Sequence, residues 1–555
     1  MAGYVIVGAG SAGCVLAARL TEDPSVEVTL IEAGGPDSAQ EIHIPIALAQ
    51  LWKSQYDWDY MSQPEPGLDG RYVYLPRGKT LGGSSSLNAM IYIRGHRADY
   101  DGWAADGAKG WSYNEVLPYF RKAEANERGD DQFHGKLGPL SVSDGRSRHP
   151  LMDAFVRAGV EAGYEENPDF NGASQDGVGW YQCTQRNGMR CSTAGAYLRP
   201  ATTRPNLKVI TDALVTRILF DGQRASGVEI ARNGALEAVH ADAEVILAAG
   251  AYNSPQLLLL SGVGPAADLA ALQIPVRLDL PVGVGLQDHP MAFMSWYTDT
   301  ETLITAATAE NAALLQTEGR GPLTSNYAEA GGFFRTRDGL EAPDVQFHAM
   351  PVITRGQGLE PPTAHAFSFS PCVLKPTSRG KVSLRSVNPA AKPNILHNYY
   401  ATAEDRQSMV EGMRIGLDIA DQPALRAHIK GAYHVPRSSS KADVWDFVER
   451  NTRTVYHPTS TCAIGPVVDS ELKVRGVERL RVVDASVMPS VVRGNTNAPT
   501  IMIAERAADL IPRTRRRGLR APGEDDFGQH FPPARLWSRV TTPPRPAFDI
   551  MMPSH

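Results

Sequence analysis

The chain has 555 residues, of which 42% are hydrophobic and 21% charged, as is typical of globular proteins. A chain of this length buries a large core and divides into about two to four structural units, which excludes a disulfide scaffold, a collagen and wholesale disorder. The formal net charge of -6 lacks the basic excess of nucleic-acid-binding proteins, and no apolar run reaches the roughly 18 residues that span a bilayer. We therefore predict no nucleic-acid partner and no transmembrane segment.

The start of the chain, residues 3–35, predicts a βαβ unit. An apolar strand at 4–7 leads into Gly8-Ala-Gly-Ser-Ala-Gly13, then into a helical stretch and a second apolar strand at 28–31 that ends at Glu32. This is the context that a G-x-G-x-x-G motif requires to bind a dinucleotide. No charged or apolar leader precedes the first strand, so the sequence predicts a cytoplasmic protein.

Each glycine of this motif has its own physical role. Gly8 permits the tight turn, Gly10 lets the backbone approach a pyrophosphate, and Gly13 lets the helix pack on the strand. The helix N-terminus directs the positive end of its dipole at the phosphates. Glu32 lies where an acid accepts hydrogen bonds from a ribose 2′-hydroxyl, and it would repel a 2′-phosphate. NAD and FAD therefore remain as cofactors, whereas NADP is disfavoured.

The middle of the chain alternates between glycine-rich segments and apolar runs. The segment 77–90 is rich in glycine and serine, whose N–H groups and hydroxyls suit an anion or a flat polar ring. Helical turns with many aromatic residues follow at 100–124. Further strands are predicted at 207–210, 214–220, 225–230, 237–240 and 244–250. A helix at 256–260 follows, and Pro255 is predicted to be its first residue.

The pattern changes between about 294 and 450, where alternating stretches at 344–350, 366–370 and 380–385 predict antiparallel strands and a second domain. A buried strand at 480–484 and a helix at 500–511 come after it. Residues 513–555 have no apolar periodicity and are rich in arginine and proline. They predict either a solvated tail or an arm that straps the surface.

The five cysteines are odd in number, and none is spaced as Cys-x-x-Cys. Neither a disulfide framework nor a zinc site is therefore predicted. We interpret the cysteines as small buried hydrophobic residues, and we predict no metal site.

Together these motifs resemble those of the glucose-methanol-choline (GMC) family of FAD-dependent oxidoreductases, and within it the bacterial alcohol dehydrogenases of the choline-dehydrogenase type. The resemblance covers about residues 3–512, in family order. The segments that carry it are the fingerprint at 8–32, the signatures at 78–88 and 250–264, and the shorter motifs at 282–289, 456–458, 484–490 and 494–499.

The resemblance implies an α/β fold with two domains. Residues 1–293 and 451–512 would form a Rossmann-like FAD-binding domain, with parts of 96–190 as a lid or cap. Residues 294–450 would form a substrate-binding domain built on an antiparallel sheet with helices. The tail at 513–555 lies outside the family core.

Two residues depart from the family pattern. Ser460 stands where the family often has glycine after the His-Pro pair, which predicts a slightly different backbone there. Leu87 stands where some choline oxidases carry a histidine bonded to FAD. We therefore expect FAD to be held non-covalently.

The resemblance also implies which residues contact FAD. The expected set is Gly8, Gly10, Ser11, Gly13, Asp484 and Ala485 at the pyrophosphate, Glu32 on the ribose, Val215 near the adenine, Gly82, Gly83, Asn88 and Ala89 near the isoalloxazine, and Ala33 and Ala249 beside them.

Oxidation of an alcohol removes a hydroxyl proton and a hydride, so the protein must supply a base, and histidine has a pKa near neutrality. Family matching implies that His457 is this base and pairs it with a second polar residue. Spacing from the closing helix favours Asn495 as the partner, where its amide bonds the developing alkoxide. Asn497 then contacts the flavin ring, and His289 is interpreted as structural.

The sequence therefore predicts an FAD-dependent enzyme that oxidises a primary alcohol to an aldehyde by hydride transfer to flavin N5. Oxygen or a quinone would reoxidise the flavin, so the choice between oxidase and dehydrogenase stays open. The alternatives are a hydroxynitrile lyase, which keeps flavin without redox use, and a cofactor-binding protein without turnover. Neither the alcohol nor the oligomeric state follows from the sequence.

Overall fold

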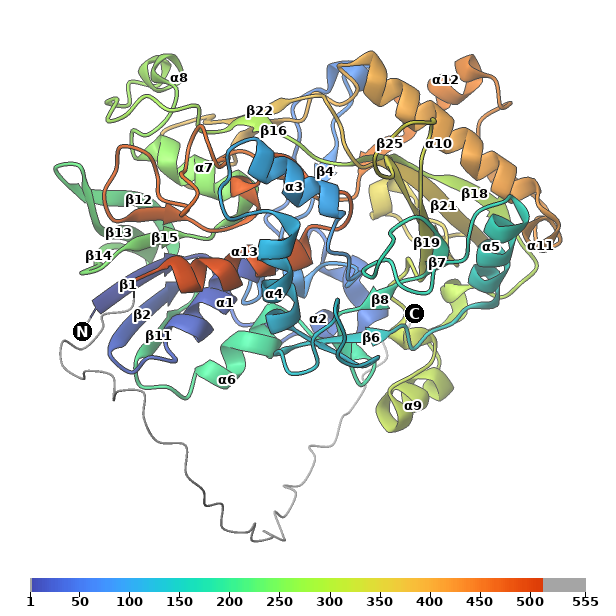
Figure 1. Cartoon of the computed structure of the whole chain (residues 1–555), viewed down its shortest axis with the longest axis horizontal. Coiled ribbons are helices and arrows are strands. Elements are labelled where there is room, and N and C mark those ends of the chain that lie inside the picture. Colours follow the sequence, from blue (N-terminus) through green and yellow to red (C-terminus); the bar gives the residue numbers. More distant parts are fainter. Residues whose placement is uncertain (1, 513–555) are drawn as a thin grey trace, which may run out of the picture. The chain divides into compact units, whose positions relative to one another are not determined.

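A computed structural model describes residues 2–512 of the chain. Residue 1 and the predicted tail at 513–555 lie outside the described residues. Figure 1 shows two large sheets in the described part, a parallel sheet on the left and an antiparallel sheet on the right.

The N-terminal strand is the middle of a five-stranded parallel sheet, as the βαβ pattern predicts. In sheet order the strands are β11 (Leu207–Ile210), β2 (Val26–Ile31), β1 (Ala2–Val7), β15 (Val245–Leu247) and β26 (Leu480–Val482). Helix α1 (Ser11–Leu20) packs against α13 (Asn497–Leu510), where the buried Glu505 accepts hydrogen bonds from Arg19. The Rossmann-like architecture is therefore confirmed.

Helix α7 (Gly250–Leu260) begins at the end of β15, so the prediction of a helix that starts at Pro255 is wrong. The carboxylate of Asp484 accepts the N–H of Gly250 at 2.9 Å, which stabilises an earlier start. Pro255 has no N–H, so it leaves the carbonyl of Ala251 without its helical partner. The hydroxyl of Thr461 donates to that carbonyl at 2.7 Å and satisfies it.

The second sheet has eight strands and is antiparallel. Six of them lie in the order β24 (Gly431–His434), β18 (Met294–Tyr297), β21 (Ala366–Val373), β20 (Val345–Met350), β19 (Ala330–Phe334) and β7 (Gly177–Trp180), and the two others are β17 (Pro290–Ala292) and β25 (Thr452–Thr454). Strands β7, β17 and β25 come from outside the segment 294–450. The predicted antiparallel sheet is present, and flanking parts of the chain complete it.

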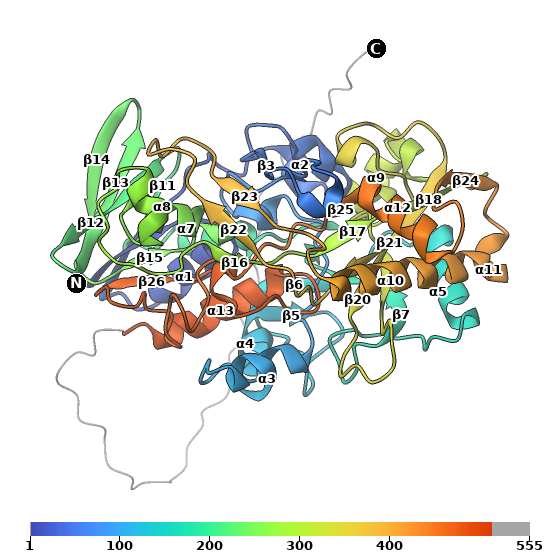
Figure 2. The ribbon, with the colours of Figure 1, turned by 90° about the horizontal axis from the view of Figure 1, so that it is seen from above.

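The two faces of this sheet differ, as alternation along β20 requires. Val345, Phe347 and Ala349 belong to an apolar core with residues of α5 (Pro150–Glu161) and α10 (Ala403–Asp421). Figure 2 shows α10 running alongside the sheet. His348 and Met350, which alternate with them along the strand, line a cavity instead.

The remaining elements connect the two sheets or cover them. A three-stranded antiparallel sheet consists of β12 (Leu214–Asp221), β13 (Arg224–Arg232) and β14 (Ala235–His240). The other α-helices of four or more residues are α2 (Gln40–His43), α3 (Arg97–Ala105), α4 (Tyr113–Ala123), α8 (Ala266–Ala271), α9 (Ala309–Glu318), α11 (Pro423–Arg426) and α12 (Lys441–Asn451). Shorter pairings join β3 (Tyr60–Met61) to β4 (Tyr74–Leu75) and β9 (Gln185–Arg186) to β10 (Met189–Arg190). In two further small sheets the central strand is β6 (Leu140–Asp144), between β5 (Glu124–Asn126) and β8 (Gln182–Cys183), and β22 (Gly380–Ser383), between β16 (Val284–Leu286) and β23 (Asn394–Leu396).

All five cysteines are buried and unpaired, which confirms their interpretation as small core residues. Within residues 2–512, no helix has both the length and the hydropathy that a membrane span needs.

Candidate active site

A cavity of about 920 Å³ is lined by residues of both sheets. Gly8 and Gly10, which follow β1, lie on its wall. So do His348 of β20 and His457, which comes shortly after β25. The dinucleotide motif and the predicted catalytic histidine therefore face the same space.

Three glycines bring backbone segments into direct contact at this cavity. Gly8 has a φ of +97°, and a Cβ atom there would lie 2.6 Å from the Ala248 carbonyl oxygen. A Cβ on Gly13 would lie 1.9 Å from the Gly8 oxygen, and one on Gly83 would lie 2.7 Å from Cα of Gly10. Only glycine permits these approaches, so the wall here is bare backbone, which fits a pyrophosphate.

Two helices begin at this bare wall. Ser11, the first residue of α1, and Asn497, the first residue of α13, both line the cavity, and the Ser11 hydroxyl donates to Oδ1 of Asn497 at 2.8 Å. No side chain caps the N–H groups at either helix start. Both positive dipole ends are therefore available to an anionic group.

Glu32 directly follows β2 and lines the same cavity. Its carboxylate accepts the N–H groups of Ala9 at 2.8 Å and Gly34 at 2.9 Å. Burial raises the pKa of Glu32 to about 7, although these two hydrogen bonds oppose the shift. A carboxylate has about four acceptor sites, so Glu32 still has capacity for ribose hydroxyls.

The structure brings most of the predicted site residues together. Those that line the cavity are Gly8, Gly10, Ser11, Glu32, Ala33, Gly83, Asn88, Ala89, Val215, Ala249, His457, Asp484, Ala485, Asn495 and Asn497. Gly13 and Gly82 lie outside the lining. Gly13 packs α1 on β1, and the N–H of Gly82 donates to the Ala9 carbonyl at 2.7 Å. Both therefore stabilise the backbone wall around Gly8, Gly10 and Gly83, which we call the glycine cradle, without lining the cavity themselves.

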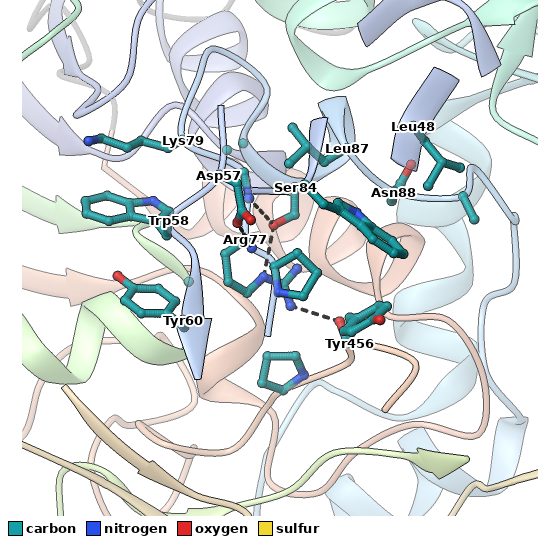
Figure 3. Close-up of a pocket in the computed structure, with 18 of the residues that line it drawn as sticks. Leu48, Asp57, Trp58, Tyr60, Arg77, Lys79, Ser84, Leu87, Asn88 and Tyr456 are labelled. Carbon is teal, nitrogen blue, oxygen red and sulfur yellow. Dashed lines mark hydrogen bonds between the residues drawn. The ribbon is translucent and has the colours of Figure 1, made fainter. Parts of the chain in front are cut away.

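Arg77 connects the glycine- and serine-rich segment to the turn before His457 (Figure 3). Its guanidinium donates to the Ser84 hydroxyl at 3.1 Å and to the Tyr456 carbonyl at 2.8 Å. Asp57 accepts the backbone N–H of Arg77 at 2.9 Å. Tyr456 has a φ of 67°, which the backbone alone disfavours, so the hydrogen bond from Arg77 to its carbonyl stabilises the turn before His457.

His457 contacts two polar side chains in the site. Its Nδ1 lies 3.0 Å from Nδ1 of His289, and its Nε2 lies 3.3 Å from the amide nitrogen of Asn495. Nε2 of His289 lies 3.0 Å from the carbonyl oxygen of Leu374. Asn497 bonds Ser11 instead, so of the two candidate asparagines it is Asn495 that reaches the histidine.

These contacts determine which nitrogen of each neutral histidine carries the proton. The Leu374 carbonyl only accepts, so Nε2 of His289 is protonated and its Nδ1 is an acceptor. Nδ1 of His457 therefore donates to it, which leaves Nε2 of His457 unprotonated. The amide of Asn495 donates to this free nitrogen, in agreement with that assignment.

The carboxylate of Asp288 fixes the backbone of both histidines. One carboxylate oxygen accepts the backbone N–H of His289 at 2.9 Å and that of His457 at 2.7 Å. The other oxygen accepts the hydroxyls of Tyr399 at 2.7 Å and Thr454 at 2.5 Å. The buried carboxylate is fully engaged, so it positions the pair and has no free oxygen for substrate.

Electrostatics keep the histidines neutral. Burial lowers the pKa of His457 well below its usual range, and His289, His348 and Arg77 lower it further. Burial also lowers the pKa of His289 to about 4 and that of His348 to about 3. At neutral pH His457 is therefore neutral and its Nε2 is unprotonated.

Three residues of the site were missed by the sequence analysis. Nδ1 of His348 is buried without a hydrogen-bond partner, and Gln346 donates to Oδ1 of Asn495 at 3.1 Å. Arg453 of β25 also lines the cavity. The alternation at 344–350 could have revealed two of them, because Gln346 and His348 are the polar residues of that strand and lie on the face opposite its apolar residues.

Comparisons with known proteins agree with this geometry. Family models described as GMC oxidoreductase match residues 2–291 and 376–504. The chain belongs to the GMC oxidoreductase family. GMC oxidoreductases are FAD flavoproteins, so this protein is an FAD-dependent oxidoreductase of the alcohol-oxidising type. The glycine cradle, the free helix ends and Glu32 fit that cofactor.

Relatives cover nearly the whole described chain. Choline dehydrogenase, mitochondrial, of Mus musculus is 46% identical over 530 residues, which covers 92% of this chain and 89% of the relative. Alcohol dehydrogenase [acceptor] of Pseudomonas putida is 43% identical over 526 residues, with 92% and 95% covered. The crystal structure of pyridoxine 4-oxidase from Mesorbium loti has a TM-score of 0.85 at 31% identity, with 92% and 99% covered.

Proposed function

We propose that this protein oxidises a primary alcohol to an aldehyde, with His457 as the base and FAD held without a covalent bond. The observation that supports it best is the unprotonated Nε2 of His457, which faces the same cavity as the glycine cradle. Leu87, which also lines the cavity, offers no nucleophile for a covalent bond to the flavin.

The side chains of the site divide the proton chemistry between them. Nε2 of His457 takes the hydroxyl proton of the alcohol, and its Nδ1–H stays bonded to His289. The amide of Asn495, which Gln346 holds through its oxygen, donates to the alkoxide oxygen as charge develops. FAD, held at the glycine cradle, would supply the acceptor for the hydride that leaves the carbinol carbon. The alcohol thus loses one proton and one hydride and becomes the aldehyde.

Anaerobic mixing with primary alcohols tests the proposal, because an alcohol oxidation bleaches the flavin. A hydroxynitrile lyase or a protein that only binds the cofactor would leave the flavin oxidised. Repeating turnover with oxygen and with a quinone-like dye then distinguishes an oxidase from a dehydrogenase. Acid precipitation should release FAD into solution, and flavin in the pellet would contradict the non-covalent assignment.

Three variants test the residue roles. His457→Ala should retain flavin and slow its reduction by roughly 10²–10⁴, the typical contribution of a general base. Asn495→Ala should slow reduction by up to roughly 10²–10³. Asn497→Ala is the matched control. It removes the bond to Ser11 at the helix starts and should reduce flavin retention rather than the rate of reduction.

Stopped-flow reduction and flavin content are measured on each variant. If His457→Ala is reduced as fast as the parent, the base is a different residue. If Asn497→Ala slows reduction more than Asn495→Ala at full flavin occupancy, the roles of the two asparagines are exchanged.

A further inference from the structure

The large sheet supplies a mainly apolar wall to the cavity around His457. Strands β17, β20 and β25 and the residues next to them contribute the apolar side chains Met291, Phe293, Met350, Val352 and Val455. Arg453 is the charged side chain that these strands add to the lining. The side of an alcohol that faces this sheet therefore meets hydrocarbon and the guanidinium of Arg453.

The register of β17 and β25 places Arg453 within this wall. Met291 pairs directly with Arg453, and directly opposed residues of antiparallel strands lie on the same face. The guanidinium carbon of Arg453 lies 4.6 Å from the ring centroid of Phe293, so it covers that aromatic face. The Arg453 guanidinium donates a hydrogen bond to the Thr354 carbonyl at 3.2 Å.

Within residues 2–512, Arg453 forms no ion pair with a carboxylate, and its guanidinium bonds a backbone carbonyl instead. The four acidic residues of the cavity lining are all bonded elsewhere. Glu32 and Asp484 accept backbone N–H groups, Asp57 accepts that of Arg77, and the exposed Glu360 pairs with Arg355 at 3.1 Å. The wall therefore carries a positive charge that no carboxylate of the described residues compensates, at a partly buried position where charges interact more strongly than in bulk water.

We propose that the substrate is a primary alcohol with an uncharged, apolar body, and that Arg453 excludes alcohols that carry a quaternary ammonium group. This inference rests on the proposed alcohol oxidation. A cation in this cavity would lose its hydration, meet a like charge and find no free carboxylate. The face of Phe293, one of several aromatic side chains that line the cavity, is covered by Arg453 and is not available to a second cation.

Two alcohols of nearly the same shape test the effect of charge. Choline and 3,3-dimethylbutan-1-ol differ at one atom, which is a positive nitrogen in choline and a neutral carbon in the other. The second-order rate constant for anaerobic flavin reduction should favour the neutral alcohol by at least about tenfold. That ratio corresponds to about 1.4 kcal/mol, a small repulsion for two desolvated like charges.

Variants of Arg453 and of Met291, which lies opposite it, test whether the charge of Arg453 causes the preference for the neutral alcohol. Arg453→Leu removes the charge, and Met291→Glu places a carboxylate directly opposite it. Each should reduce the preference for the neutral alcohol by at least about fivefold. Arg437→Leu is the matched control, because Arg437 is 76% exposed and lies outside the lining. It should leave the ratio unchanged.

The outcomes separate this inference from the function on which it rests. Straight-chain primary alcohols that bleach the flavin, together with choline as effective as its neutral analogue, would overturn the inference and leave alcohol oxidation intact. A preference that neither Arg453→Leu nor Met291→Glu changes, at full flavin occupancy, would also overturn it. If no primary alcohol bleaches the flavin, the proposed function itself fails.

Discussion

Replacement of His289 by leucine removes the acceptor that selects the tautomer of His457. Nδ1 of His289 lies 3.0 Å from Nδ1 of His457, and its own proton is bound to the Leu374 carbonyl. A hydrogen bond of this kind contributes about 0.5–1.5 kcal/mol, which corresponds to a factor of about 2–10 in tautomer population. We therefore expect His289→Leu to slow anaerobic flavin reduction by up to about tenfold at unchanged flavin content.

His289→Asn is the matched control, because its Oδ1 keeps an acceptor near the position of Nδ1. Reduction of this variant should stay within a few-fold of the parent. Stopped-flow absorbance measures the rate, and the flavin spectrum measures occupancy. A leucine variant as fast as the parent would refute the tautomer argument. Equally slow leucine and asparagine variants would indicate that ring packing matters instead of the acceptor.

Two further predictions concern stability. Ser460→Gly should raise the free energy of unfolding by about 1 kcal/mol, because Ser460 has a φ of 73°, which is costly for residues other than glycine; a lower value in urea unfolding would contradict this. His348→Leu should make the protein less sensitive to acid. Burial lowers the pKa of His348 to about 3, so below a pH of about 6.5 the unfolded chain gains a proton that the folded protein does not. The parent should lose about 2 kcal/mol relative to the variant between about pH 6.5 and 5, and parallel stability curves would refute the shift.

The cofactor side of the cavity was predictable because short segments determine it. Positive φ at Gly8 and the close approach at Gly13 are local requirements that appear in the sequence as glycine. The strands of the parallel sheet were predictable for the same reason, because each appears in the sequence as a short apolar run. Glu32 could be placed because it ends the second strand of a continuous βαβ unit.

Contacts between distant segments were not predictable in this way. The start of α7 depends on Asp484, and its proline is tolerated because Thr461 bonds the carbonyl of Ala251. Ser460 was expected to alter its backbone. The structure instead gives it the left-handed conformation that glycine favours.

The pairing of β17 with β25 controls the positions of His457, the proposed base, and of the wall that we propose contacts the substrate. Each strand has only three residues, too few for a periodic signal. At one end of the pairing, the chain before β17 and the chain after β25 bring His289 against His457. Within it, Met291 opposes Arg453. A shift of one residue would turn these side chains to the opposite face and separate the two imidazoles. The tautomer of the base and the charge of the wall therefore depend on one register, which no single segment of the sequence encodes.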